Sequence, residues 1–528
     1  MTATQTAPPA PAAERTHPRW WAAALSGLVA GAVTVGLAEL LAAVLTVTGL
    51  AGGQPSPVIS VGDAFVDRTP GPLKDFAVRT FGENDKLVLL GSIGLVLVVL
   101  ALAAGIAAGR RLVVGLGLVL LLGLVAVGAI MTRPSASPLD VVPTVIGTAA
   151  GLWTLRWLIE RATPTTSDDG SAAGWSRRTF LGSAGAAGAA AVVAGGAGHV
   201  LESSLGSVED SRAKVRLPKA AEPVTVPKDV QLPIKGITPW QTDPATFYRV
   251  DTALRLPQIT TEEWSLKVHG KVGKELTIDY RTLVAKPLVE RLITLTCVSN
   301  EVGGKLLGNA VWLGYPVKDL LADLEVDPGA DMVLSTSQDG MTISTPLENL
   351  TKNRDALLAV AMNGEPLPVQ HGFPVRMVVP GLYGYVSATK WVTDLKVTRF
   401  ADDEAYWTPR GYSAKAPIKF SSRIDVPKGF AQLKAGKNAI AGVAWAQAVG
   451  VAKVQVRVDR GSWQDARLAG APSKNTWVQW VYEWDAEPGS HTLECRLVDA
   501  DGNEQVESKH GIRPDGSTGL DSKNVTVS

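Results

Sequence analysis

The sequence predicts three structural parts in one chain: an N-terminal α-helical membrane bundle, an α+β domain and an all-β sandwich. Nearly all long apolar runs lie before residue 201, which predicts the bundle. Alternating strand patterns with some helical spacing follow, and then short alternating runs between Gly, Pro and Asp turns. The chain has 528 residues, more than one hydrophobic core usually organises, so several domains are expected.

Charge and cysteine content narrow the class of protein. The chain has 51 Lys and Arg residues against 50 Asp and Glu, a formal net charge of +1, so nothing in the composition indicates a nucleic-acid partner. Cys297 and Cys495 are the only cysteines. A disulfide framework is therefore excluded, and at most one bridge could join distant parts of the chain.

The N-terminal part contains four apolar runs long enough to cross a bilayer. The first, residues 20–48, follows three basic residues, a flank typical of the cytoplasmic side. An Arg-Arg pair divides the next two runs into a hairpin whose tight turn is cytoplasmic. These three runs are followed by a weaker one that has charges near its ends; the later runs are residues 87–109, 112–131 and 139–159.

Ser176-Arg-Arg-Thr-Phe-Leu181 introduces an uncharged Ala/Gly/Val run at residues 182–200. The motif resembles a twin-arginine export signal; a plain fifth span with arginines on its cytoplasmic side is the alternative, and both give the same topology. Five spans from a cytoplasmic N-terminus place everything after residue 200 outside the cytoplasm. We therefore expect a multi-pass protein of the cell membrane with an extracytoplasmic catalytic part. The twin-arginine route moves folded proteins, which favours a complex, buried cofactor.

Two features bear on whether the spans carry protons or electrons. Glu39 lies nearer the outer end of the first span than its middle. Its role is either to mark a proton path or to contact a neighbouring helix. None of the six histidines lies inside the first four spans. No haem is therefore expected in the bundle, and the spans are predicted to be an anchor.

Cys297 ends an alternating, β-branched run, Leu292-Ile-Thr-Leu-Thr-Cys-Val-Ser-Asn-Glu-Val-Gly-Gly304. A thiolate is a soft ligand that suits a polarisable metal, and Gly-Gly lets backbone approach a large cofactor. Cys297 is therefore a candidate metal ligand. A buried core thiol is the alternative for a lone cysteine.

Cations and a Gly-rich loop gather at residues 371–391. His371-Gly-Phe-Pro-Val-Arg376 opens an apolar strand, and Tyr383-Gly-Tyr-Val-Ser-Ala-Thr-Lys-Trp391 follows it. Backbone N–H groups, hydroxyls and cations converge in such loops, which suits an anion. Elsewhere in this part, alternation predicts strands at residues 247–257 and 264–270, and helical spacing after a proline predicts a helix at residues 316–324.

The motifs C-V-S-N-E, H-G-F-P-V-R, V-V-P-G-x-Y-G and S-A-T-K-W, in this order and spacing, resemble the molybdenum-cofactor domain of the sulfite oxidase family. The resemblance runs from about residue 247 to residue 391. It implies that Cys297 gives its thiolate to molybdenum while the dithiolene of molybdopterin gives the other sulfurs. The expected cofactor contacts come from Phe247, Tyr248, Arg249, Ser299, Asn300, His371, Arg376, Ser387, Thr389 and Lys390.

The sequence departs from the animal and plant sulfite oxidases in segments that concern substrate. Their Gly-Asn-Arg-Arg after the cysteine is here Val-Ser-Asn-Glu301, and their Arg-Asn-His is here Arg249-Val-Asp-Thr252. The arginines of the family attract an oxyanion, and Glu301 would repel one if it faced the same pocket. A cytochrome-like haem module is also absent. The expected redox partner is therefore an external electron carrier, a cytochrome or a quinone-linked protein.

The C-terminal part opens with Trp407-Thr-Pro-Arg-Gly-Tyr412, which resembles the W-x-x-R-x-Y segment whose tyrosine returns to the molybdenum pocket. Tyr412 is thus a candidate catalytic residue; an exposed loop tyrosine is the alternative. The alternating runs that follow predict an immunoglobulin-like sandwich, with Cys495 in its core. Similarity makes it a dimerisation domain and implies a homodimer. The runs are residues 439–446, 451–458, 476–484 and 491–498.

The expected boundaries place each of these features in one part of the chain. They are a cytoplasmic tail (1–19), a four-span membrane anchor (20–163), a linker with the twin-arginine-like fifth span (164–200), a linker (201–229), a molybdopterin-binding domain (230–404) and an immunoglobulin-like dimerisation domain (405–528).

The hypothesis is an exported, membrane-anchored molybdenum-cofactor oxidoreductase. It would perform two-electron oxygen-atom transfer on sulfite or a related small sulfur or nitrogen oxo compound. One alternative is an S-oxide or N-oxide reductase of the same fold; another is a membrane-tethered binding module without cofactor. Metal analysis separates the last from the others, and the direction of catalysis separates the first two.

Overall fold

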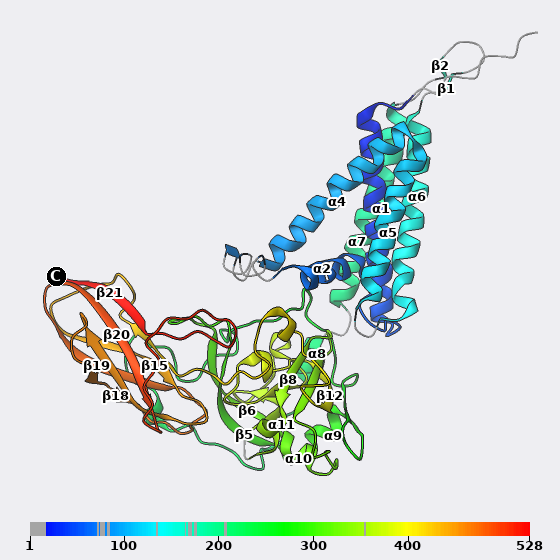
Figure 1. The fold of residues 1–528 in the computed structure, drawn as a ribbon. Coiled ribbons are helices and arrows are strands. Elements are labelled where there is room, and N and C mark those ends of the chain that lie inside the picture. The colour runs from blue at the N-terminus through cyan, green and yellow to red at the C-terminus, as the bar shows by residue number, and fades with distance from the viewer. Residues whose placement is uncertain are drawn as a thin grey trace, which may run out of the picture. The chain divides into compact units, whose positions relative to one another are not determined.

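The computed structural model describes residues 17–528 apart from short gaps, and these residues form two compact units, Met1–Leu205 and Gly206–Ser528. Figure 1 shows their helices and strands. The gaps are residues 71–72, 74–75, 77–79, 82–84, 134–135, 164, 167–171, 174–176, 205–207 and 353–354.

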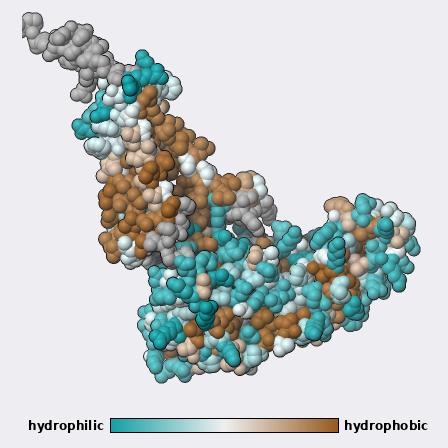
Figure 2. Space-filling model, turned by 180° about the vertical axis from the view of Figure 1, so that it is seen from behind, coloured by the Kyte–Doolittle hydropathy of each residue, from teal (hydrophilic) through white to brown (hydrophobic). Residues whose placement is uncertain are grey.

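Five helices of the first unit are long and apolar enough to cross a membrane, which confirms the five predicted spans as helices. Small residues bring their backbones together: a Cβ on Gly27 of the first helix would lie 2.6 Å from the backbone nitrogen of Gly105 in the second. Apolar residues dominate the visible surface of this unit (Figure 2). The helices are α1 (Trp20–Val47), α4 (Asp85–Arg110), α5 (Leu112–Met131), α6 (Val142–Ala162) after the 3-10 turn η2 (Pro138–Val141), and α7 (Arg177–Ser204).

A further helix, α2 (Pro57–Arg68), was not expected from the sequence. The side chain of Ser56 caps it by accepting a hydrogen bond from Ile59 N–H at 3.3 Å, and proline occupies its first turn. Glu39 of α1 accepts hydrogen bonds from the Ser56 hydroxyl at 2.8 Å and from Val58 N–H at 3.3 Å. Glu39 therefore meets the start of a neighbouring helix, one of its two predicted roles.

The twin-arginine-like motif lies at the start of α7. Arg177 and Arg178 are the first residues of the helix, while Ser176 and most of the predicted linker before it lie outside the described residues. A short antiparallel pair, β1 (Thr165–Thr166) and β2 (Ala172–Ala173), belongs to this linker.

The second unit begins with α8 (Val208–Lys214) and η3 (Lys228–Val230) and continues into two five-stranded sheets. In one sheet the order is β10-β9-β6-β5 with β11 paired to β9; in the other it is β4-β3-β12-β7-β8. The strands of the first sheet are β5 (Val289–Thr296), β6 (Leu307–Pro316), β9 (Leu357–Met362), β10 (Glu365–Pro366) and β11 (Arg376–Val378). Those of the second are β3 (Ser265–Gly270), β4 (Leu276–Asp279), β7 (Met332–Ser337), β8 (Thr342–Pro346) and β12 (Val392–Thr398).

Short helices connect these strands. They are α9 (Tyr280–Val284), α10 (Val317–Ala322), α11 (Leu347–Thr351), η4 (Val369–His371), η5 (Gly384–Val386) and η6 (Thr408–Arg410). The predictions of a strand at residues 264–270 and a helix at 316–324 are confirmed by β3 and α10. The predicted strand at residues 247–257 is wrong, since no residue of this segment pairs with a sheet. Its alternation arises because Phe247 and Ala253 are each buried from a loop.

The C-terminal part of the second unit consists of two sheets that share one apolar core. Ile440, Val454, Trp480 and Cys495, from four strands of the two sheets, are all fully buried in it. Cys495 is a free thiol, as a core residue should be. The first sheet has the order β13 (Ser421–Val426), β15 (Gly436–Trp445), β19 (Val478–Ala486) and β18 (Arg467–Leu468). The second has β14 (Gln432–Leu433), β21 (Asp521–Val527), β20 (Gly489–Asp499), β16 (Val451–Val458) and β17 (Gln464–Asp465).

Hydrogen bonds join this part to strand β5 of the middle part. Thr294 N–H donates to the carbonyl of Asn475 at 2.9 Å, and Trp477 N–H donates to the Thr294 hydroxyl at 2.9 Å. The amide of Gln447 donates to the Thr294 carbonyl at 2.5 Å and accepts from Gly381 N–H at 2.9 Å. The two predicted soluble domains therefore form one compact unit.

Candidate active site

Cys297 follows the last residue of β5 and is 8% exposed. It opens a turn, residues 297–306, which we call the cysteine turn and which leads into β6. Cys297 N–H donates to the carbonyl of Leu306 at 2.9 Å, and the Asn300 side chain accepts from Leu306 N–H at 2.8 Å. Ser299 N–H donates to the sulfur of Cys297 at 3.4 Å. The sequence therefore places the thiol correctly at a strand end, within a turn that fixes its position.

The electrostatic surroundings of Cys297 keep the thiol protonated. Burial raises its pKa, and this outweighs the opposing effects of hydrogen bonds from Ser299 and the charge of Lys390. A buried thiol becomes a thiolate when a cation binds it. The site therefore suits a metal that displaces the proton.

Two cations lie beside one buried carboxylate near this thiol. Asp251, whose side chain is 3% exposed, accepts from Arg249 Nε at 2.8 Å and from Lys390 Nζ at 2.9 Å. Lys390 also donates to the carbonyl of Gln370 at 3.2 Å. Burial lowers the pKa of Lys390 to about 8, although Asp251 opposes this. One negative charge is therefore shared between two positive ones.

Arg376 of β11 adds a third cation in a more deeply buried position. It is 5% exposed, donates to the carbonyls of His371 at 3.0 Å and Ala388 at 3.4 Å, and lies over the ring of Trp312 at 5.2 Å. Burial lowers its pKa to about 10. In the described part of the chain, no carboxylate pairs with it. A buried charge is costly without a counter-ion, so Arg376 marks a site for an anion.

His371 is neutral in this environment. Its Nε2 lies 3.0 Å from the carbonyl of Pro244, and because a carbonyl can only accept, Nε2 carries the proton. Burial and the charge of Arg376 lower the pKa of His371 to about 4. The neutral ring therefore leaves Nδ1 unprotonated, as an acceptor.

Phe247 and Tyr248 enclose the same region. Their rings stack at 5.3 Å, and Phe247 meets His371 edge-on at 5.6 Å. A Cβ on Gly384 would lie 3.7 Å from both the Tyr248 hydroxyl and the carbonyl of Thr296, so Tyr248 and the base of the cysteine turn flank this glycine. Burial raises the pKa of Tyr248, and it responds to the charges of both Cys297 and Arg376.

Three predicted contact residues use their side chains on the protein itself. The hydroxyl of Ser387 donates to the carbonyls of Leu382 at 3.1 Å and Tyr383 at 3.0 Å. The hydroxyl of Thr389 lies 2.5 Å from that of Ser335. Asn300 closes the cysteine turn, as described above. These side chains shape the loops, and their contact with a cofactor stays a prediction.

Tyr412 is buried, so the alternative of an exposed loop tyrosine is wrong. Its ring lies 5.4 Å from those of Tyr385 and Trp407. The guanidinium carbon of Arg513, from the segment between β20 and β21, lies 5.3 Å from the ring of Tyr412. Because Tyr385 follows Gly384, this cluster lies next in sequence to the glycine that the end of β5 flanks.

Sequence reasoning missed Asp251 and Arg513. Asp251 carried a weak signal, since it stands two residues after Arg249 in a segment already singled out. Arg513 carried none, because it comes from a loop of the C-terminal part that is remote in sequence. Glu301, in the cysteine turn, is exposed.

The donor set at Cys297 fits a metal that brings ligands of its own. In the described residues, no three His, Cys, Asp or Glu side chains gather as an ion site. A lone thiol that is influenced by the charge of Lys390, with Arg249 and Arg376 close to that lysine, instead suits an anionic organic cofactor that carries the metal. The residues present therefore fit molybdopterin.

Residues 253–407 match the family described as oxidoreductase molybdopterin binding domain, so the fold and site define a molybdopterin-binding oxidoreductase. The chain is 33% identical over 150 residues to the uncharacterized oxidoreductase YuiH of Bacillus subtilis, covering 28% of this chain and 72% of that protein. It is 25% identical over 346 residues to mitochondrial sulfite oxidase of Mus musculus, covering 55% of this chain. The chain belongs to the sulfite oxidase family of molybdopterin-dependent oxidoreductases.

The chain spans 60% of the length of the mouse sulfite oxidase. Among solved structures, the sulfane dehydrogenase SoxCD from Paracoccus pantotrophus is similar with a TM-score of 0.49 and 21% identity, covering 60% of this chain and 89% of that one. The family implies molybdenum bound by molybdopterin as the cofactor of this oxidoreductase.

Proposed function

We propose that this protein is an exported, membrane-anchored molybdenum enzyme that transfers an oxygen atom, with two electrons, to or from a small sulfur or nitrogen oxo compound. The observation that carries the proposal is Arg376, a buried cation on strand β11 that donates to main-chain carbonyls and lies over the ring of Trp312. Among the described residues, no carboxylate forms an ion pair with it. Such a group stabilises the protein only when an anion binds it. The phosphate of molybdopterin is that anion.

The chain's own residues divide the work of holding the cofactor. Cys297 would ligate molybdenum, and Arg249, Arg376 and Lys390 would hold the phosphate and pterin. The unprotonated Nδ1 of His371 would accept a hydrogen bond from the pterin. Bound molybdopterin supplies the two-electron exchange of an oxygen atom. The protein excludes water and sets the position of the thiolate.

Two charged residues bear on the substrate. Arg513, at the ring of Tyr412, would draw a small oxyanion such as sulfite toward the hydroxyl of that tyrosine. Glu301 stands where relatives with known sulfite activity carry an arginine, which favours a neutral S-oxide or N-oxide. Oxidation of sulfite is the first candidate, and reduction of an S-oxide or N-oxide is the second.

The proposal extends to the place and assembly of the enzyme. Five membrane-length helices and the arginines that begin α7 support an extracytoplasmic position for residues 206–528. The two-sheet C-terminal part is an immunoglobulin-like domain, a proposal supported by the apolar core that its two sheets share. By similarity to the family, it is a dimerisation domain. An external electron carrier completes the catalytic cycle.

The test is the molybdenum and pterin content of the purified full chain and of Arg376→Met. The wild type should contain both, and Arg376→Met should lose most of the pterin because its anion site is gone. Arg291→Met is the matched control: Arg291 lies on β5 but pairs with Glu222 and Asp355. Wild-type protein without molybdenum, or full pterin content in Arg376→Met, would overturn the proposal.

A further inference from the structure

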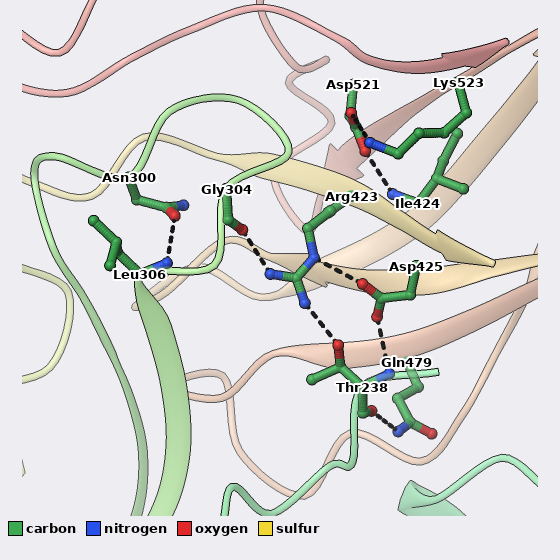
Figure 3. A network of polar contacts seen from close by, with 10 residues as sticks. All are labelled: Thr238, Asn300, Gly304, Leu306, Arg423, Ile424, Asp425, Gln479, Asp521 and Lys523. Atoms are coloured by element: carbon green, nitrogen blue, oxygen red, sulfur yellow. Dashed lines mark hydrogen bonds and ion pairs between the residues drawn. The ribbon is translucent and has the colours of Figure 1, made fainter. Parts of the chain in front are cut away.

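An arginine of the C-terminal sheets donates a hydrogen bond to the cysteine turn. Arg423 of β13 is 6% exposed and uses each guanidinium nitrogen once (Figure 3). Nε donates to Asp425 at 2.9 Å, Nη1 to the carbonyl of Gly304 at 2.7 Å, and Nη2 to the hydroxyl of Thr238 at 2.8 Å. The planar guanidinium therefore spans three segments of the chain at once.

The groups around Arg423 are themselves fixed. The second oxygen of Asp425 accepts from Thr238 N–H at 3.0 Å, and the amide of Gln479 donates to the carbonyl of Thr238 at 2.7 Å. The side chains of Arg423, Asp425 and Gln479 in this network are buried. Hydrogen bonds of a charged group are stronger when they are buried, and the partners Asp425 and Thr238 are held by further hydrogen bonds. Arg423 therefore presents a fixed donor to the Gly304 carbonyl.

Two further contacts hold the same turn. The hydroxyl of Ser517 donates to the carbonyl of Asn300 at 2.8 Å. Gly303 has φ +75°, and a Cβ there would lie 2.5 Å from Oδ1 of Asp521. The other oxygen of this carboxylate, Oδ2, accepts from Ile424 N–H at 2.8 Å. The Gly-Gly pair was predicted to admit a cofactor; at Gly303 the close neighbour is instead this carboxylate of the C-terminal part.

We propose that Arg423 is a positioning residue for Cys297. By holding the Gly304 carbonyl, it fixes the turn whose first residue is the candidate metal ligand, so the C-terminal sheets set where the sulfur lies. A metal ligand performs its function only when its supporting contacts hold it within about 0.5 Å. The inference rests on the proposed ligand role of Cys297 and adds the source of its rigidity.

The experiment measures the turn directly, in full-length protein produced without molybdopterin. One readout is the rate at which iodoacetamide alkylates Cys297, with fully buried Cys495 as the internal reference. The other is hydrogen exchange of the peptide 297–306. Removing a charge-assisted hydrogen bond should raise both rates roughly 10- to 100-fold in Arg423→Met. Arg457→Met is the matched control, because Arg457 pairs with Glu494 on the sheet β14-β21-β20-β16-β17.

Two milder variants separate positioning from simple folding. Arg423→Lys keeps a charge beside Asp425, but an ammonium cannot span Thr238 and Gly304 together, so thermal stability should recover while both rates stay raised. In the holoenzyme, this variant should lower kcat more than it raises KM. Ser517→Ala should raise the rates several-fold even if Arg423→Met does not accumulate.

Unchanged alkylation and exchange in both Arg423→Lys and Ser517→Ala would overturn the proposal. Both rates are measured in protein without bound cofactor. If the alkylation and exchange rates rise but Cys297→Ser is fully active, the proposed function is refuted. The role of Arg423 in holding the cysteine turn would still be established.

Discussion

Two buried arginines of the second unit should respond differently to replacement by methionine in cofactor-free protein. Burial lowers the pKa of Arg376 to about 10, well below that of a free arginine, and at about 1.4 kcal/mol per pKa unit this opposes folding by roughly 3 kcal/mol. Arg376→Met removes this penalty. It also loses hydrogen bonds to the carbonyls of His371 and Ala388, about 2 kcal/mol together, and a contact with Trp312 of about 1 kcal/mol.

The net expectation is that Arg376→Met changes the stability of the cofactor-free protein by less than about 1 kcal/mol, or roughly 1–2 °C in Tm for a unit of this size. Arg423→Met should instead destabilise it. It leaves the carboxylate of Asp425 buried without its cation, which costs about 3–5 kcal/mol, or roughly 5–7 °C.

The assay is thermal unfolding of the detergent-solubilised full chain, with and without bound cofactor. The wild type should gain stability on binding, whereas Arg376→Met should gain none, because its anion site is lost. If Arg376→Met lowers the Tm of cofactor-free protein as much as Arg423→Met does, Arg376 is a structural residue. The reasoning that it marks an anion site would then be refuted.

Three other predictions concern the ligand, the topology and the substrate. Cys297→Ser should retain fold and pterin but lose turnover, because a hydroxyl is a harder and less acidic ligand; full activity would sink the assignment. Protease added to intact spheroplasts should remove residues 206–528, and replacing Arg177 and Arg178 with Lys should block export; protection of the wild type would invert the topology. Arg513→Met should raise the KM for sulfite roughly 10- to 100-fold, and Glu301→Gln should lower it. If neither variant changes the KM, sulfite binds elsewhere in the protein.

The sequence predicted the elements whose signal is local. The alternation before Cys297 correctly placed the thiol at the end of β5, and long uncharged runs predicted the membrane-length helices. The alternation at residues 247–257 failed because Phe247 is buried from a loop, and burial alone does not distinguish a loop from a strand. The local pattern of apolar residues indicates which side chains are buried, but not which elements pack against them.

The electrostatics of the site could not be predicted from the sequence. Asp251 shares its carboxylate between Arg249 and Lys390, and the second of these is 139 positions away. Arg513 reaches Tyr412 from a loop with no periodic pattern. Pairings of this kind depend on how the sheets pack, which motif spacing does not encode.

The residues that hold the cysteine turn, Arg423 and Ser517, are synthesised well after the turn itself. Arg423 follows Gly304 by 119 positions, and Ser517 follows Asn300 by 217. The cysteine turn therefore leaves the ribosome long before the residues that hold it, and nascent chains present Cys297 on an unsupported loop. A translation pause between Gly304 and Arg423 would therefore lengthen the time during which the turn lacks both contacts.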